Sequence, residues 1–501
     1  MRTATFTVDP AFAVAPVNRR TFGSFVEHMG RCVYTGIYEP GHPSADSDGL
    51  RTDVLELTRE LGVSMVRYPG GNFVSGYRWE DGVGPVAERP TRLDTAWHSV
   101  ESNEFGLHEF MAWAAKAGVE PMMAVNLGTR GTQEALDLLE YCNHPAGTRL
   151  ADLRRKNGAE EPFGVRLWCL GNEMDGPWQL GQKTPAEYGR VAHTVGRAMR
   201  MVEPGLELVA CGSSSSDMPT FGSWEATVLR ECYEQVDYVS AHAYYENRGD
   251  VASFLGSAVN MDNFVADVVA TADAVRAAGR HRKRIDISFD EWNVWYQSKL
   301  PESLPTEWVA APRISEEAYS VVDAVVVGSL LISLLRHSDR VTAACQAQLV
   351  NTLAMIRTEP GGPAWRQSIF HPFALTSRHA RGTVLRVEPV VQTYETEQHG
   401  DVPFIDAVAT HDDESGETVI FAVNRSQDGP VLLDVDLRAV PVGHTVEHLT
   451  LADDDILAVN SAAAPQRVVP RRHDAASLEG GHLLTTLPAV SWNVLRVRPP
   501  A

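Results

Sequence analysis

The feature that most constrains the fold is a regular alternation of short apolar runs with helical patterns. Most of the runs are continuously apolar, which is typical of parallel strands covered on both faces. Eight strand–helix alternations predict an α/β fold, a closed (β/α)8 TIM barrel rather than an open doubly wound sheet. No Gly-x-Gly-x-x-Gly motif follows the first run, which further disfavours a dinucleotide-binding sheet. The runs are Phe22–Glu27, Ser64–Tyr68, Pro121–Leu127, Val165–Glu173, Glu207–Gly212, Val236–Tyr244, Ile285–Glu291 and Val341–Gln348.

Several of the intervening helices have recognisable ends. We expect Asp48 to cap one that ends at Gly62, and Asn103 to precede another that ends at Gly118. Ser315, followed by two glutamates that favour a helix N-terminus, is expected to begin a long helix that runs to Leu335.

The pattern changes after about residue 375. Residues there alternate or are rich in β-branched types, turn signals separate them, and helical periodicity is nearly absent. This predicts a C-terminal antiparallel β-sandwich, jelly-roll-like in character. Thr3–Val8 also alternates, and we expect it to add a strand to the sandwich. The predicted domains are therefore residues 1–17 with the sandwich, the barrel over 18–374, and the sandwich over 375–501. The sandwich strands are expected at Val384–Val391, Pro403–Ala409, Glu417–Val423, Val431–Leu437, His444–Leu451 and His482–Leu487.

Composition excludes some classes of partner. The formal charge of −21 on 501 residues disfavours nucleic acid and anionic membranes and suits a neutral substrate. The six cysteines have no zinc-site spacing, and we expect no metal and no cofactor. The longest apolar run, Val321–Leu335, is too short to span a bilayer. The N-terminus makes a poor secretory signal, so a cytoplasmic location is expected.

Every predicted barrel strand ends in a polar residue. Barrel enzymes place their active sites at this face. Strands must enter polar loops in any case, but that alone does not predict carboxylates beside Asn, Gln, His, Tyr and Trp. The strand ends carry Glu27 with His28, Arg67 followed by Asn72, Asn126, Asn172 with Glu173, Ser213, His242 with Tyr244, Asp290 with Glu291, and Gln348.

Glu173 and Glu291 close the fourth and seventh predicted strands, which face each other across the barrel mouth. Two carboxylates across a pocket divide acid and nucleophile roles in glycosidases. Asp290 competes with Glu291, because strand alternation sends the two to opposite sides and the pattern does not say which faces the mouth. Loop tryptophans, Trp97 and Trp178 among them, are candidates to stack on sugar rings.

Long motifs of the chain resemble those of family 51 α-L-arabinofuranosidases. The resemblance implies that Glu173 is the acid/base and Glu291 the nucleophile, which decides against Asp290. It implies support of the carboxylates by Arg67 and His242. It also implies that the arabinofuranosyl ring is held by Glu27, Asn72, Asn172, Tyr244 and Gln348. The motifs are Phe25–His28, Gly36–Pro40, Arg67–Phe73, Trp168–Trp178, Phe289–Asn293 and Ala347–Asn351.

The resemblance further implies an exo-acting, retaining hydrolase of arabinofuranosyl oligosaccharides in arabinan catabolism, and a homohexamer. Ala243, where some relatives are expected to have glutamine, leaves the linkage preference open. Two alternatives remain, an endo-β-glucanase or β-xylosidase on the same barrel and a non-catalytic sugar-binding barrel.

Overall fold

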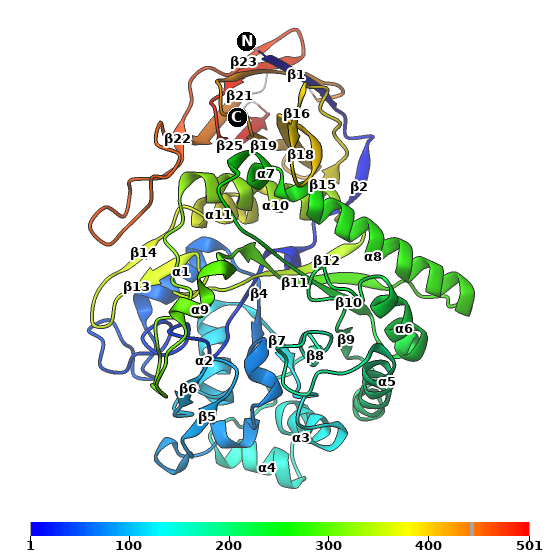
Figure 1. The fold of residues 1–501 in the computed structure, drawn as a ribbon, viewed down its shortest axis with the longest axis vertical. Helices are drawn as coiled ribbons and strands as arrows, with labels where there is room; N and C mark the ends of the chain where they lie inside the picture. Colours follow the sequence, from blue (N-terminus) through cyan, green and yellow to red (C-terminus); the bar gives the residue numbers. More distant parts are fainter. Residues whose placement is uncertain (1, 441–444, 500–501) are drawn as a thin grey trace.

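A computed structural model describes residues 2–440 and 445–499. Figure 1 shows a barrel with its helices in the lower part of the molecule and a sandwich of β-sheets above it. The helices α10 (Val321–Arg336) and α11 (Phe370–His379) lie between the two parts. Within these ranges, no helix combines the length and the apolar character needed to cross a membrane.

The barrel is closed by eight parallel strands, which confirms the predicted TIM-type fold. In barrel order they are β3 (Gly23–Phe25), β4 (Met65–Tyr68), β7 (Glu120–Ala124), β8 (Leu167–Leu170), β9 (Glu207–Ala210), β10 (Tyr238–Tyr245), β11 (Asp286–Val294) and β12 (Val341–Gln346). Each predicted run overlaps one strand, although most strands are shorter than the runs, and β7, β10 and β11 extend past one end of theirs.

Helices surround this barrel, and short two-stranded pieces lie outside the main sheets of the molecule, one of them at the sandwich. The helices are α1 (Thr52–Leu61), α2 (Leu107–Ala117), α3 (Thr132–Asn143), α4 (Arg149–Lys156), α5 (Pro185–Val202), α6 (Ser223–Cys232), α7 (Val251–Leu255), α8 (Ser257–Gly279) and α9 (Leu300–Ser303), besides α10 and α11. The two-stranded pieces are β5 (Arg92–Asp94) with β6 (Ser99–Glu101), β13 (Ile356–Thr358) with β14 (Ala364–Arg366), and β16 (Thr393–Thr396) with β17 (Gly400–Pro403).

Two predicted helix starts are wrong. The N-cap residue of α1 is Arg51, not Asp48, although α1 does end at Gly62, in the left-handed conformation. The helix α2 follows Asn103 and ends at Gly118, as predicted, with Gly106 as its N-cap residue.

The helix α10 begins at Val321, six residues later than predicted. Ser315 has a φ of 46°, which a helix start does not allow. Instead Ser320 caps α10, and the Asp323 carboxylate accepts the Ser320 backbone N–H at 2.7 Å in a reciprocal capping box.

The C-terminal part consists of two main sheets with an apolar core between them. One predicted strand, Val384–Val391, is wrong beyond residue 385, and the final strand was not predicted although it lies inside the larger sheet. His444, the predicted start of another strand, lies outside the described residues. The larger sheet has the order β2 (Ala13–Pro16), β15 (Thr383–Leu385), β18 (Ile405–Asp412), β19 (Glu417–Asn424), β25 (Ser491–Arg498), β21 (Thr445–Leu451) and β22 (Arg471–Arg472). The smaller has the order β1 (Arg2–Val8), β20 (Val431–Leu437), β24 (His482–Leu487) and β23 (Ser477–Glu479).

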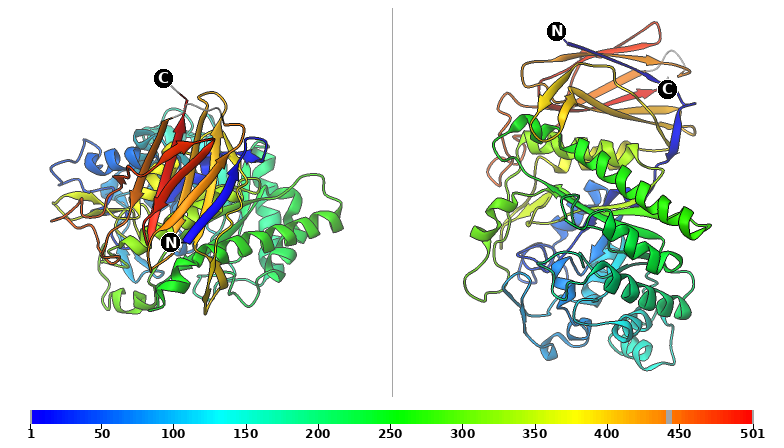
Figure 2. Two further views of the ribbon diagram at one scale, coloured as in Figure 1. Left: turned by 90° about the horizontal axis from the view of Figure 1, so that it is seen from above. Right: turned by 45° about the vertical axis from the view of Figure 1, so that its right-hand side comes forward.

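The first strand of the chain, β1, pairs in parallel with β20, from Arg2 opposite Val431 to Val8 opposite Leu437. Its alternate side chains Ala4, Phe6 and Val8 are buried in the sandwich core. Figure 2 shows both chain ends at the sandwich. The division of the chain at residues 17/18 and 374/375 stays a prediction, and α11 runs across residue 375.

The long helix α10 joins the two parts, since it contacts both α8 and the sandwich strands β18, β19 and β25. At Gly328 the helix approaches so closely that a Cβ there would lie 2.1 Å from Cδ1 of Trp492. Beside it, the buried Arg425 donates to Ser329 and to Asp406, at 2.7 Å each. This packing fixes the sandwich against the barrel.

Candidate active site

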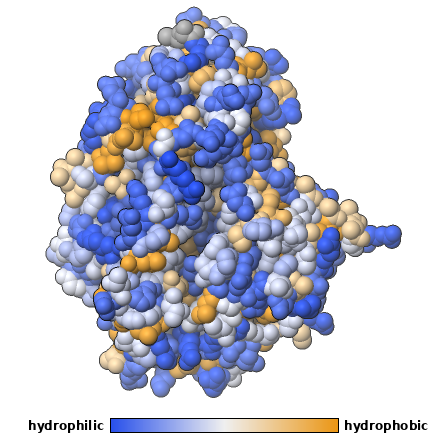
Figure 3. Space-filling model, in the orientation of Figure 1, coloured by the Kyte–Doolittle hydropathy of each residue, from blue (hydrophilic) through white to orange (hydrophobic). Residues whose placement is uncertain are grey.

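Buried polar side chains converge where the barrel strands end. All the residues predicted for the site lie in this region, but Asn72 makes no side-chain hydrogen bond to the described protein groups and borders a hollow at the rim. Figure 3 shows that the surface in this view is largely hydrophilic and is hollowed near its centre. The buried members are Glu27, Arg67, Asn172, Glu173, His242, Asp290, Glu291 and Gln348, each 8 % exposed or less.

Glu291 is fixed by two donors. Arg67 Nη1 donates to its Oε1 at 2.7 Å, and the Tyr244 hydroxyl donates to its Oε2 at 2.8 Å. The register places His242 on β10 opposite Glu291 on β11. A carboxylate held through both oxygens by such donors is fixed in one orientation, as a nucleophile must be.

Glu173 follows β8 and is held from the opposite side. His242 Nδ1 lies 2.8 Å from its Oε1, and the indole Nε1 of Trp178 donates to its Oε2 at 2.6 Å. Its φ of 43° is uncommon for a residue with a side chain, a strain that recurs at functional sites. One oxygen of Glu173 lies within 4.8 Å of one oxygen of Glu291.

His242 connects three carboxylates. Its Nδ1 contacts Glu173, and its Nε2 lies 2.8 Å from Oδ1 of Asp290. Burial alone lowers the pKa of His242, but the neighbouring carboxylates outweigh burial and raise the pKa to about 10. The imidazole is therefore a cation at neutral pH, with both nitrogens donating.

The same geometry bears on metal binding. Glu173, His242 and Glu291 offer atoms close enough together to surround a cation. However, a protonated imidazole has no lone pair for a metal. The arrangement therefore fits proton chemistry better than coordination, and the absence of a metal stays a prediction.

Strand alternation failed at Asp290 and Glu291. The strand register shifts between Ser240 and His242 and again between Phe289 and Trp292, so both carboxylates reach His242. Asp290 lies deeper in the barrel, where Ser288 donates to it at 3.1 Å. Burial raises the pKa of Asp290, but Arg67 and His242 lower it below its usual value, so the group is ionised. Sequence reasoning missed Asp290 as a partner of His242 and Ser288 as a donor to Asp290, because a bulge leaves no pattern.

Glu27 is the most enclosed carboxylate near the mouth. The backbone N–H of Phe73, the indole of Trp97 and the amide of Gln348 donate to it, at 2.9, 3.0 and 3.2 Å. Burial raises the pKa of Glu27 to about 8, the Phe73 hydrogen bond opposes the rise, and the charge of Glu291 adds to it. Gly70 is needed beside it, because its φ is 146° and a Cβ there would lie 2.5 Å from Cγ of Glu27.

Two of the predicted asparagines have supporting contacts. Asn172 accepts a hydrogen bond from Arg67 Nη2 at 2.6 Å, so Arg67 ties the two sides of the site together. Asn126, another strand-end residue, donates instead to the Tyr77 carbonyl at 2.9 Å and stabilises a loop.

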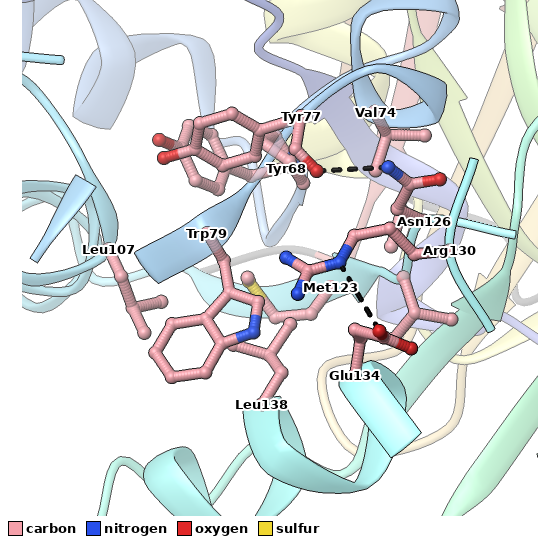
Figure 4. Close-up of a pocket in the computed structure, with 13 residues that line it drawn as sticks. Tyr68, Val74, Tyr77, Trp79, Leu107, Met123, Asn126, Arg130, Glu134 and Leu138 are labelled. Atoms are coloured by element: carbon pink, nitrogen blue, oxygen red, sulfur yellow. Dashed lines mark hydrogen bonds and ion pairs between the residues drawn. The ribbon is translucent and has the colours of Figure 1, made fainter. Parts of the chain in front are cut away.

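A separate cavity lies behind the site, between the barrel and α3 (Figure 4). Its accessible volume is about 30 Å³ and its lining is mainly apolar, with Trp79 and Leu138 on one side. Arg130 and Glu134 form an ion pair at its edge, at 3.8 Å. The space holds about one water molecule and is too small for a sugar.

Comparisons with known proteins identify the family. The α-L-arabinofuranosidase 1 domain matches residues 57–266, and the α-L-arabinofuranosidase C-terminal domain matches residues 290–491. The chain is 59 % identical to an intracellular exo-α-(1→5)-L-arabinofuranosidase of Streptomyces lividans, over 100 % of this chain and 76 % of that protein. It is 53 % identical to an exo-α-(1→6)-L-arabinofuranosidase of Bifidobacterium longum, over 98 % and 96 %. A solved family 51 α-L-arabinofuranosidase from Bifidobacterium longum superposes with a TM-score of 0.96, at 49 % identity over 99 % of this chain and 100 % of that chain. With this site and these matches, the chain belongs to the family 51 α-L-arabinofuranosidases.

Proposed function

We propose that the protein releases terminal non-reducing α-L-arabinofuranosyl residues from arabinose-containing oligosaccharides, with retention of configuration. One observation carries the mechanism: oxygens of Glu173 and Glu291 lie within 4.8 Å of each other at the barrel mouth. Carboxyl groups of retaining glycosidases are about 5–5.5 Å apart, whereas inverting enzymes need about 6.5–9.5 Å to fit a water molecule between them.

In the first step a carboxylate oxygen of Glu291 attacks the anomeric carbon. The bond to the leaving oxygen breaks as Glu173 gives that oxygen its proton, which leaves a glycosyl ester on Glu291. Arg67 and Tyr244 hold Glu291 in the attacking orientation. Trp178 occupies Oε2 of Glu173 in the free enzyme, so the leaving oxygen takes the place of the indole at that atom.

In the second step Glu173 takes a proton from water. The resulting hydroxide attacks the anomeric carbon, the ester bond to Glu291 breaks, and arabinose leaves with its original configuration. His242 shares a hydrogen-bonded proton with Glu173 at 2.8 Å, and the ionised Asp290 keeps that imidazole charged. These contacts support a role for His242 in positioning Glu173.

The exo character follows from enclosure of the ring. Glu27, Trp97 and Gln348 form a hydrogen-bonded wall that leaves each of them 5 % exposed or less. Such a wall accepts a terminal sugar and does not let a polymer pass through. We assign ring contacts to these groups and to Asn72, Asn172 and Tyr244.

We further propose a cytoplasmic location and a role in arabinan catabolism, on short arabino-oligosaccharides. Several relatives are named intracellular, which supports this location. A homohexamer is proposed on family resemblance alone, and light scattering of the purified protein tests it.

A panel of aryl glycosides tests the activity. We expect strong hydrolysis of the α-L-arabinofuranoside and little of the β-D-glucoside or β-D-xyloside. NMR of the first product should show retained configuration. Preferential cleavage of a glucoside or xyloside would favour the alternative glycosidases, and no cleavage of any would favour a sugar-binding barrel.

A further inference from the structure

Two adjoining hollows lie beside the catalytic site. The first has a volume of about 340 Å³ and contains Asn72 and Trp178 in its lining. The second has a volume of about 310 Å³ and contains Arg92 and Leu93. Each is large enough for a pentose ring. The residues common to both linings are Phe73, Gly76, Asp94, Thr95 and Leu180.

The first hollow begins at the acid/base. Trp178 lines it and donates its indole N–H to Glu173. Asn72, also in its lining, follows Gly71, where a Cβ would lie 3.2 Å from Oε1 of Glu291. A leaving group protonated by Glu173 therefore emerges into this hollow.

The second hollow has the surface chemistry of a sugar site. Leu93 on β5 and Leu180 on the loop after β8 are 60 % and 45 % exposed, and both line it. Single exposed leucines are common, but two on one hollow offer an apolar surface for the C–H face of a sugar. Arg92 and Asp81 form an ion pair there, at 2.9 Å, which offers a donor and an acceptor to hydroxyl groups.

Gly76 controls the passage between the hollows. It is exposed, lines both of them, and a Cβ there would lie 3.5 Å from Cδ2 of Leu180. Its φ of −105° suits any residue, so the backbone itself does not require glycine. The missing side chain instead keeps the passage open.

We propose that the second hollow, defined by Asp81, Arg92, Leu93 and Leu180, is a subsite for the sugar one unit beyond the leaving sugar. The substrate class that fills it is a neutral, linear arabino-oligosaccharide of three or more units. The subsite rests on the proposed function, because its position is defined by the leaving group of that reaction.

The test compares kcat/KM for an α-1,5-linked arabinofuranosyl trisaccharide with that for the disaccharide. In the wild type we expect a ratio of about ten, the gain from a contact worth about 1.4 kcal/mol. Leu93→Ala removes the apolar surface and Gly76→Val narrows the passage, so each should lower the ratio to about two or three. Leu457→Ala is the matched control, because Leu457 is 62 % exposed and lines neither hollow, and it should keep the wild-type ratio.

A wild-type ratio near one, or a ratio that survives both Leu93→Ala and Gly76→Val, would overturn the subsite. Leu93 is exposed on a hairpin, so its variant remains informative if Gly76→Val folds poorly. The aryl α-L-arabinofuranoside separates the two proposals. If the wild type hydrolyses it without any preference for the trisaccharide, only the subsite is wrong. If the wild type hydrolyses no arabinofuranoside, the proposed function fails and the subsite with it.

Discussion

The two ends of the barrel carry the same residue types in different surroundings. At the N-terminal end Arg20 lies between Glu120 and Glu207, at 2.5 and 2.7 Å. At the C-terminal end Arg67 lies near Asp290 and Glu291, at 3.9 and 2.7 Å.

Exposure separates the two clusters. The side chain of Arg20 is 19 % exposed and its glutamates are 36 % and 29 % exposed, whereas Arg67 is 2 % exposed. Water screens the charges of the Arg20 cluster. In this cluster the hydrogen bond from Arg20 is the main cause of the lowered pKa of Glu207. At the mouth, burial raises the pKa of Glu27, whereas the charges of Arg67 and His242 outweigh burial and lower the pKa of Asp290. A carboxylate beside an arginine therefore does not by itself indicate an active site. A buried cluster in which carboxylates outnumber the cationic side chains does indicate one.

The largest expected effect comes from breaking the mouth cluster at Glu291. Glu291→Ala should lower kcat by about 10⁴-fold or more, because no nucleophile remains. Azide should restore turnover and give a glycosyl azide of inverted configuration, which NMR detects. Near-normal rates without azide would exclude Glu291 as the nucleophile.

Removing the acid should have a smaller effect that depends on the leaving group. We expect Glu173→Gln to lower kcat/KM on arabino-oligosaccharides by about 10²–10⁴-fold, and much less on an aryl substrate with an acidic leaving group. Kinetics on a series of aryl arabinofuranosides of graded leaving-group pKa measures this. An equal loss across the series would contradict the assignment of Glu173 as the acid.

The third prediction concerns the pH dependence that the raised pKa of Glu27 gives to the mouth of the barrel. With its pKa raised to about 8, Glu27 is protonated at pH 7 and ionises as the pH rises, which adds a charge close to Glu291. Because the pKa of this carboxyl group is raised, the protonated form and its contribution are present at lower pH. Both are lost as the pH rises through about 8.

We expect the wild-type kcat/KM to fall about ten-fold between pH 7 and 9, and Glu27→Gln to flatten this part of the profile, at a reduced overall rate. An unchanged alkaline limb in the variant would assign it to another group.

The smallest effect is expected at the opposite end of the barrel. Arg20→Ala removes partly exposed ion pairs, so it should lower stability by no more than about 1–2 kcal/mol and leave kcat and KM within about two-fold. Thermal unfolding and steady-state kinetics measure both. A large loss of activity would show that charge at this end reaches the mouth.

The fold was predictable from sequence wherever a regular pattern of apolar residues indicated a strand or a helix. The barrel strands are short, continuously apolar runs of sequence. The strand β1 is recognisable by the alternation of Ala4, Phe6 and Val8. The start of α10 was misplaced, because Ser315 and Ser320 both look like caps and only backbone geometry distinguishes them. The strand β25, inside the larger sheet, was missed although Pro488 precedes its run and Pro499 follows it.

The site was predictable as a set of strand ends but not as a network. Glu173 and Glu291 follow from strand counting, whereas the choice between Asp290 and Glu291 came from family resemblance. The bridge from Glu173 through His242 to Asp290 depends on two register shifts, which are tertiary features without a sequence period. Asn126 had the same sequence signal as Asn172 but serves a loop, so single strand-end residues predict little by themselves.

The pairing of β1 with β20 has a consequence for biosynthesis. The strand β1 leaves the ribosome before its partner β20, which follows only after more than four hundred residues. At a translation rate of about 5–20 residues per second, β1 waits on the order of 20–90 s for the edge it completes.

During that time Ala4, Phe6 and Val8 lie on an unpaired strand with an apolar face, the kind of segment that pairs wrongly with other chains. The barrel, whose strands are contiguous in the chain, can close while β1 is still waiting. Maturation of the protein should therefore be limited by the pairing of β1 with β20, and nascent β1 is a segment that a chaperone has reason to hold.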